Sequence, residues 1–175
     1  MKLEEFYAHL ENTKGPRWII PRIDFAHGAS LKSSVLFLLE SPGPQVRTTR
    51  LISLNNNDPS ASNLKKQLLE ARVPLREVVL WNVVPWIAAN GRGFETPTSA
   101  QITEAREQNL LLFNVFRSLA TIVFVGKKAQ REFVFYSGHT DSRLLASHHP
   151  SAQAMTVRQR WKENVEVFKR IQPNA

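Results

Sequence analysis

Short runs of continuous apolar residues alternate along this chain with stretches whose apolar residues recur at helical spacing. The continuous runs lie at residues 35–39, 78–83, 122–125 and 144–146. A strand that is covered by helices on both faces of its sheet is apolar without alternation. These four runs therefore predict buried strands of a mostly parallel sheet.

The stretches with helical periodicity carry recognisable start signals. Asp58 followed by Pro59 is an N-cap with proline at the first helical position. Thr98 and Gln101 form a capping-box pattern. Together with the apolar periodicity, these signals predict helices at residues 3–10, 59–72, 99–120 and 157–168.

The alternation of strands and helices predicts an α/β fold, a three-layer αβα sandwich around a central, mostly parallel four-stranded sheet. Residues 15–30 show no periodic pattern, and we expect an irregular connection there. The chain has no internal repeat and no linker-like stretch, and its length of 175 residues suits one domain. We therefore expect a single domain over residues 1–175.

The composition excludes several kinds of site. The chain has no cysteine, so it forms no disulfide, no cysteine-ligated zinc site, no thiolate-held iron–sulfur cluster and no cysteine nucleophile. The adjacent His148 and His149 face opposite ways on an extended chain, and no third ligand has a suitable spacing. We expect neither a metal nor another cofactor.

The apolar runs and the N-terminus indicate a protein that is neither secreted nor embedded in a membrane. No run approaches the roughly 20 apolar residues that span a bilayer. The first six residues are amphipathic and acidic, unlike a secretion signal. We expect an intracellular, cytoplasmic monomer, associated with the nucleoid if the protein is bacterial.

An excess of basic residues indicates a polyanionic partner. Lysine and arginine number 23 against 15 aspartate and glutamate, a formal net charge of +8. A field of this sign favours nucleic acid, and DNA is the partner we expect. Charge alone also fits an ordinary hydrated surface, so the assignment depends on the motifs that follow.

Polar residues and proline turns follow three of the predicted strands. In an open α/β sheet, chemistry gathers beyond the carboxyl ends of the strands, where helix N-termini point their donors. Glu40 and the turn Pro42-Gly43 follow the first run, Asn82 interrupts the second, and His149 follows the fourth. A Pro-Gly turn presents backbone N–H groups at close range. A buried amide such as that of Asn82 needs a partner, from the protein or from a ligand edge.

This combination of motifs resembles the uracil-DNA glycosylase superfamily over roughly residues 35–151. Members carry a motif of the Gly-Glu-Ala-Pro-Gly kind after the first core strand, matched here by Leu-Glu-Ser-Pro-Gly at residues 39–43. They also carry an asparagine at the end of a central strand, matched by Asn82, and a His-Pro-Ser motif, matched by residues 149–151. Each motif is short, but the three in this order on an α/β background are specific.

The resemblance implies a monofunctional DNA glycosylase of base excision repair, which flips uracil or another altered base into a pocket and hydrolyses its N-glycosidic bond. Such a reaction needs donors near a base carbonyl and a positioned water. By this resemblance, His149 stabilises the leaving-group oxygen, Asn82 reads the base edge, and the Pro42-Gly43 loop donates backbone N–H groups. Glu40 or Ser41 holds the water.

The chain departs from the family pattern at two places. Ser41 stands where many relatives have a water-activating Asp or Asn, and a serine is no base at neutral pH. Relatives also stack a phenylalanine on the flipped base, but the comparable stretch here contains Leu51 and no aromatic residue. We expect Leu51 to line the base pocket. Either Trp81 or Trp86 supplies the stacking surface, or the preferred base differs from uracil. The absence of cysteine places the chain in a branch without an iron–sulfur cluster.

Further residues are candidates for contacts with DNA. Lys127, Lys128, Arg158 and Arg160 would neutralise flanking phosphates. Ser151 ends the third motif and caps the helix that follows it. In relatives a wedge side chain after this motif fills the vacated base stack, and here Gln153 or Met155 stands at that place.

Two other classes of function stay open at this point. The chain can be a nucleic-acid-binding module of the same fold that has lost hydrolysis, in keeping with Ser41 and the missing phenylalanine. More remotely, it can be an α/β hydrolase or transferase acting on a small anion. The chain lacks a Gly-x-Ser-x-Gly elbow, a phosphate-binding glycine-rich loop and a dinucleotide fingerprint, so we rank this class last.

Overall fold

The central feature of the computed structural model, which describes residues 1–93 and 95–171, is a four-stranded parallel sheet. Its strands are β3 (Val35–Leu39), β5 (Val78–Asn82), β7 (Thr121–Val125) and β8 (Arg143–Ser147), in the order β5-β3-β7-β8. All three pairings are parallel, with Val35 opposite both Val78 and Thr121. The four strands lie where the apolar runs predicted them.

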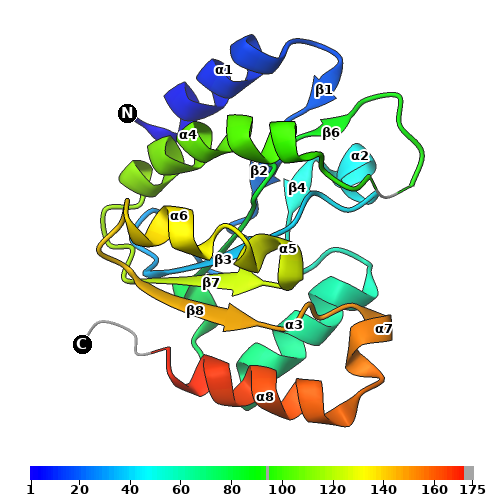
Figure 1. The fold of residues 1–175 in the computed structure, drawn as a ribbon, viewed down its shortest axis with the longest axis vertical. Coiled ribbons are helices and arrows are strands. Elements are labelled where there is room, and N and C mark those ends of the chain that lie inside the picture. Colours follow the sequence, from blue (N-terminus) through cyan, green and yellow to red (C-terminus); the bar gives the residue numbers. More distant parts are fainter. Residues whose placement is uncertain (94, 172–175) are drawn as a thin grey trace.

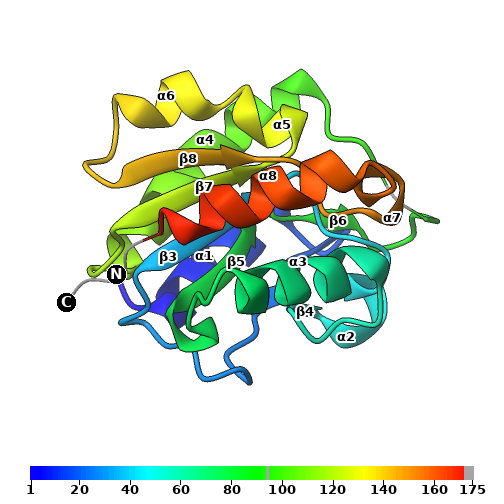
Figure 2. The same cartoon turned by 90° about the horizontal axis from the view of Figure 1, so that it is seen from below.

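Helices cover both faces of this sheet and form the outer layers of the sandwich (Figures 1 and 2). On one face lie α1 (Leu3–Lys14) and α4 (Ser99–Val115), and on the other lie α3 (Pro59–Glu70) and α8 (Arg158–Lys169). The apolar side chains of both layers meet the strands in one core. The Phe37 ring of β3, for example, packs edge to face against the Phe168 ring of α8, with 5.1 Å between the ring centroids. The α/β sandwich predicted from the sequence is therefore confirmed.

The helix starts agree with their sequence signals, whereas some helix ends do not. The Asp58 carboxylate accepts a hydrogen bond from the Ala61 backbone N–H at 2.9 Å, and the capping box of Thr98 and Gln101 is formed. The helix predicted at residues 99–120 ends at Val115 instead, because the chain turns back there to enter β7. No glycine or proline marks that turn, so periodicity alone overestimated the helix.

Residues 15–30 are not wholly irregular, and this part of the prediction is wrong. They contain β1 (Trp18–Ile19), which pairs antiparallel with β6 (Ile87–Ala88), and β2 (Arg22–Ile23), which pairs parallel with β4 (Leu51–Ile52). Two-residue strands are too short to show a period. The remaining helices are α2 (Val46–Thr49), the 3₁₀ turn Leu75–Glu77, α5 (Lys127–Gln130), α6 (Phe133–Ser137) and α7 (Ala152–Met155).

The parallel strands all point toward one edge of the molecule, on the right in Figure 1. There α2, α5, α7 and the start of α3 surround the carboxyl ends of the strands, while the N-terminus lies on the opposite side (Figure 1). This edge is where a parallel α/β sheet offers a binding crevice. Within the described residues, no helix has the length and apolarity needed to cross a membrane.

Candidate functional site

A cavity of about 440 Å³ opens at the carboxyl edge of the sheet. Its size lies within the usual range for a small-ligand site. Two chain segments and several core residues form its wall: residues 41–46, 56–61, Leu39, Ile52, Ser53, Leu64, Leu80, Asn82 and His149. The structure thus brings the first motif, the strand-end asparagine and the His-Pro-Ser motif together around one hollow.

The Pro-Gly turn of the first motif forms one side of the cavity. Pro42 is buried, and the carbonyl of Gly43 accepts a hydrogen bond from the Val46 N–H as the chain enters α2. A Cβ placed on Gly43 would meet no atom within 4 Å, and Gly43 does not have positive φ. The folded chain itself therefore does not require glycine here, and without a Cβ the backbone of this turn is open to close approach.

Asn82 lies at the end of β5 and lines the cavity with an unpartnered oxygen. Its side chain is 3% exposed, and its Oδ1 is buried without a hydrogen-bond partner among the described residues. An unpaired buried carbonyl costs roughly 1–3 kcal/mol of desolvation. Native proteins retain few such groups, and a site that awaits a ligand is one place where they occur.

Asn109 of α4 holds the two neighbours of Asn82 in place. Its Oδ1 accepts a hydrogen bond from the Trp81 indole N–H at 2.9 Å, and its Nδ2 donates to the Val83 carbonyl at 2.9 Å and the Tyr136 hydroxyl at 3.0 Å. Sequence reasoning missed Asn109. The available signal was a polar residue on the apolar face of its helix, where amides are uncommon unless paired.

His149 contributes a neutral imidazole to the cavity wall. Burial lowers the pKa of His149 below its usual value, although the charges of Glu40 and Asp58 act in the opposite direction. The Ser151 backbone N–H donates to His149 Nδ1 at 3.1 Å, so the ring proton sits on Nε2. A Cβ at Gly126, which has φ +84°, would lie 3.0 Å from the His149 Cβ, so glycine is needed for the ring to take this position.

Of the two residues predicted to hold water, Ser41 lines the cavity and Glu40 does not. Glu40 is not among the residues that line the cavity, and its Oε1 accepts a hydrogen bond from Lys128 Nζ at 2.7 Å. This ion pair also occupies Lys128, which the sequence suggested for a phosphate contact. Ser41 does line the cavity, but its hydroxyl donates to the Glu95 carbonyl at 3.1 Å.

The aromatic and apolar residues that were expected to contact the base do not line the cavity. Trp81 is fully buried, and its indole N–H is bound to Asn109. Trp86 is 2% exposed, lies under Lys14 Nζ at 4.0 Å, and does not line the cavity. Leu51 is also absent from the wall, where its neighbours Ile52 and Ser53 stand. No Phe, Tyr or Trp occurs among the described residues that line the cavity.

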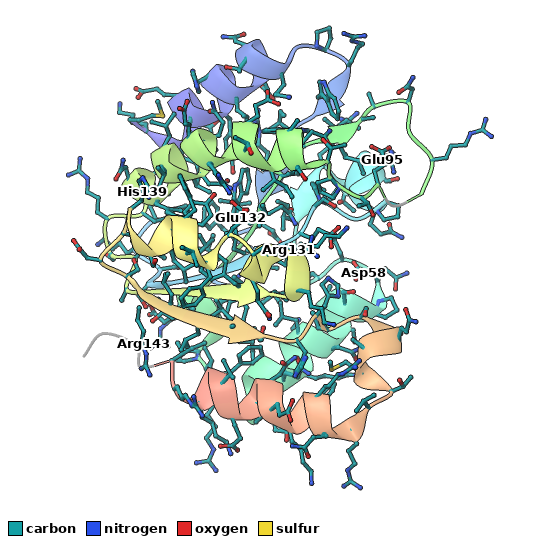
Figure 3. All side chains as sticks on the ribbon, in the orientation of Figure 1. Asp58, Glu95, Arg131, Glu132, His139 and Arg143 are labelled. Carbon is teal, nitrogen blue, oxygen red and sulfur yellow. The ribbon has the colours of Figure 1, made fainter. Side chains whose placement is uncertain are left out.

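A carboxylate that sequence reasoning treated only as a helix cap lies in the cavity wall. Asp58 caps α3 through its Oδ1 and lines the cavity together with Asn56 and Asn57. Figure 3 labels Asp58 at the carboxyl edge of the sheet. The N-cap pattern of Asp58 and Pro59 was visible in the sequence, but that pattern does not reveal which side of the helix start faces a ligand.

The remaining predicted DNA contacts lie on or near α5, α7 and α8 at the same end of the molecule (Figure 1). Gln153, Lys127, Arg158 and Arg160 are exposed. Met155 is half-buried, and Gln67 Nε2 donates to its Sδ at 3.0 Å. Ser151 caps α7 by accepting a hydrogen bond from the Ala154 N–H at 3.3 Å. In the described part of the chain, no cluster of three or more His, Asp or Glu residues could hold a metal ion.

The chain is similar in sequence to one family of known proteins. A family model described as the uracil DNA glycosylase superfamily matches residues 25–172. Among solved structures, 44 chains match, one of them in the crystal structure of a mimivirus UNG variant in complex with UGI. That match has 14% sequence identity and a TM-score of 0.46, and it covers 86% of this chain and 65% of that one. No curated protein matches the chain significantly in sequence.

Proposed function

The chain belongs to the uracil DNA glycosylase superfamily, and from this premise we propose that it is a monofunctional DNA glycosylase that removes a deaminated base. The observation that carries the proposal is the cavity in which the unpartnered Asn82 oxygen and the neutral His149 share one wall. A base that is flipped out of the duplex fills such a hollow and supplies the missing hydrogen bond.

The amide of Asn82 suits the edge of a deaminated base. Deamination replaces an exocyclic amine with a carbonyl and places an N–H beside it. The Oδ1 of Asn82 accepts a hydrogen bond from that N–H, and the Nδ2 of Asn82 donates one to the new carbonyl. A site built around a hydrogen-bonding edge rejects analogues that present the wrong pattern, because its own buried groups are then left unpaired.

His149 and the first motif would act on the departing base. Cleavage of the N-glycosidic bond leaves negative charge on the base, and Nε2–H of a neutral imidazole donates to the carbonyl oxygen that carries this charge. The backbone of the Pro42-Gly43 loop approaches the same hollow without a side chain in the way. No step in this scheme requires a metal or an organic cofactor.

The surface around the cavity suits the backbone of DNA. The net charge of +8 favours association with a polyanion. Lys127, Arg158 and Arg160 are exposed near the site, where they would neutralise phosphates, and Gln153 is the better placed of the two wedge candidates because Met155 is half-buried. We propose that the chain acts as a monomeric, single-domain protein on DNA.

Oligonucleotides that carry one uracil, hypoxanthine or xanthine provide the test. We expect alkali-sensitive breaks at the altered base with the native protein, and loss of these breaks with His149→Ala at nearly unchanged DNA affinity. His139→Ala is the matched control, because His139 lies far from the cavity, on the left in Figure 3. Intact DNA with every altered base would contradict the proposal.

A binding module without hydrolysis is the second candidate function. It is supported by the Lys128 ion pair of Glu40 and by the engagement of the Ser41 hydroxyl, which leave the first motif without a free base. In that case the native protein would retard DNA that carries an altered base but would leave it intact after alkali.

A further inference from the structure

We propose that Asp58 is the carboxylate that orients the attacking water and accepts its proton. The inference rests on the glycosylase function proposed above and assigns the step for which the first motif offers no free base. It places the catalytic carboxylate on the start of α3, a segment distinct from the three motifs that carry the resemblance.

The composition of the cavity wall is the first argument for Asp58. Among the described residues that line the cavity, Asp58 is the only carboxylate, and His149 is the only other ionisable group. His149 serves poorly as a base for water while its Nε2–H faces a departing oxyanion. Glu40 stands outside the wall and is paired with Lys128.

The geometry of the helix start is the second argument. The Ala61 N–H binds Asp58 Oδ1 at 2.9 Å, and the Asp58 backbone N–H donates to the Asn56 carbonyl at 2.8 Å. These bonds fix both the backbone and one oxygen of the carboxylate. The second oxygen, Oδ2, accepts no hydrogen bond from the described residues and is available to a water molecule. A preorganised acceptor of this kind loses little freedom on binding water.

The position of Asp58 relative to His149 is the third argument. Both residues line the same cavity, and the Asp58 charge acts to raise the pKa of His149. Cleavage separates charge, with positive charge on the sugar and negative charge on the base. A carboxylate and a neutral N–H donor that line the same cavity match that separation of charge.

The chemical step balances with these two groups and one water. The C1′–N bond breaks, and its electron pair leaves with the base, whose carbonyl oxygen is bound by His149 Nε2–H. The water oxygen forms the new C1′–O bond and passes one proton to Asp58. The base anion takes a proton from solvent after release, and Asp58 returns its proton to solvent.

Replacement of Asp58 by asparagine separates the chemical role from the capping role. Asparagine caps helices as well as aspartate does, so Asp58→Asn should unfold at nearly the same urea concentration as the native protein. Its single-turnover excision rate should fall by about 100-fold or more, the usual contribution of a general base. Its affinity for DNA with an abasic site should stay the same. Asp141→Asn, an exposed carboxylate beside β8, is the matched control and should excise like the native protein.

A second variant guards against loss of the fold. Glycine is also an acceptable N-cap, and Asp58→Gly leaves room for a small carboxylate, so added formate should restore part of its excision rate. An Asp58→Asn variant that excises as fast as the native protein would overturn this inference and leave the proposed function intact. A native protein that releases no base from any substrate would overturn both.

Discussion

Two buried asparagines, Asn82 and Asn109, lie close together in the core and differ in one respect. Asn109 is 0% exposed and makes three hydrogen bonds to Trp81, Val83 and Tyr136. Asn82 is 3% exposed, yet its Oδ1 has no partner among the described residues. The fold satisfies one amide completely and leaves the other open to a cavity.

The difference separates groups that hold the fold from groups that face a ligand. A buried amide with every partner stabilises its surroundings, whereas one with a missing partner weakens the folded state, and a ligand site is one place where such a group occurs. The same criterion sorts the carboxylates, because Glu40 is paired with Lys128 and Asp58 Oδ2 is not.

The largest effect is expected from Asn109→Leu. This change leaves the Trp81 indole N–H, the Val83 carbonyl and the Tyr136 hydroxyl buried without their partner. We expect the free energy of unfolding to fall by about 3 kcal/mol or more, at roughly 1–3 kcal/mol for each of the three unpaired groups. Urea denaturation measures the loss. A stability equal to that of the native protein would show that these groups find other partners.

The matched change at Asn82 should impair excision without lowering stability. Asn82→Leu removes an unsatisfied group, so the free energy of unfolding should stay level or rise. Excision should fall by about 100-fold to 1,000-fold, as when a hydrogen-bonding group is removed from other preorganised sites. Single-turnover excision and urea denaturation on the same preparation measure both. Parallel losses of stability and activity at Asn82 and Asn109 would break the distinction between them.

His149 lies between the fully paired Asn109 and the unpaired Asn82. Its Nδ1 accepts a hydrogen bond from Ser151, whereas its Nε2 needs a partner from a ligand. Burial lowers its pKa, so the stability that the neutral ring contributes is present above the usual value of 6.5. This stability is lost as the pH falls below that value, with a slope of at most about 1.4 kcal/mol per pH unit. Urea denaturation from pH 7 to 5 should show a steeper loss for the native protein than for His149→Asn. Parallel curves would exclude His149 as the titrating group.

The smallest effect is expected where an ion pair is partly exposed. Lys128→Met removes the partner of Glu40, whose side chain is 19% exposed. Such pairs contribute about 1 kcal/mol or less, so unfolding should shift only slightly, and excision should stay close to that of the native protein. A large rise in excision would show that Lys128 restrains Glu40 from a catalytic role and would break the sorting of the two carboxylates.

Much of the site could be anticipated because its residues stand at strand ends. Once four apolar runs are assigned to parallel strands, the residues that follow them must gather at one edge, and Asn82 and His149 do line one cavity there. The partners of Glu40 and Asn109 could not be anticipated in the same way. Lys128 is 88 residues from Glu40 in the chain, and no local pattern specifies which charge meets which.

The residues predicted for the base pocket differ from the observed cavity wall where the prediction depended on side-chain direction. Trp81 and Trp86 are large and close to Asn82 in sequence, but the first is enclosed by the core and the second lies beneath Lys14. Asp58 is the opposite case, because it lines the cavity although it was not predicted to do so. The N-cap signal identified its role at the start of α3 but gave no indication of its place in the cavity wall. Local sequence signals indicate the backbone conformation of a residue. They do not indicate which distant segment or cavity its side chain contacts.

For this protein the sequence by itself determined the strands, the helix starts, the edge of the sheet where chemistry gathers and the family motifs. These follow from periodicity and capping, which act over a few residues. Only the tertiary structure decided which polar groups are paired and which face the cavity, as with Asn109 and Asn82. That decision depends on contacts between segments far apart in the chain, because desolvation makes a buried polar group costly unless the fold or a ligand supplies a partner.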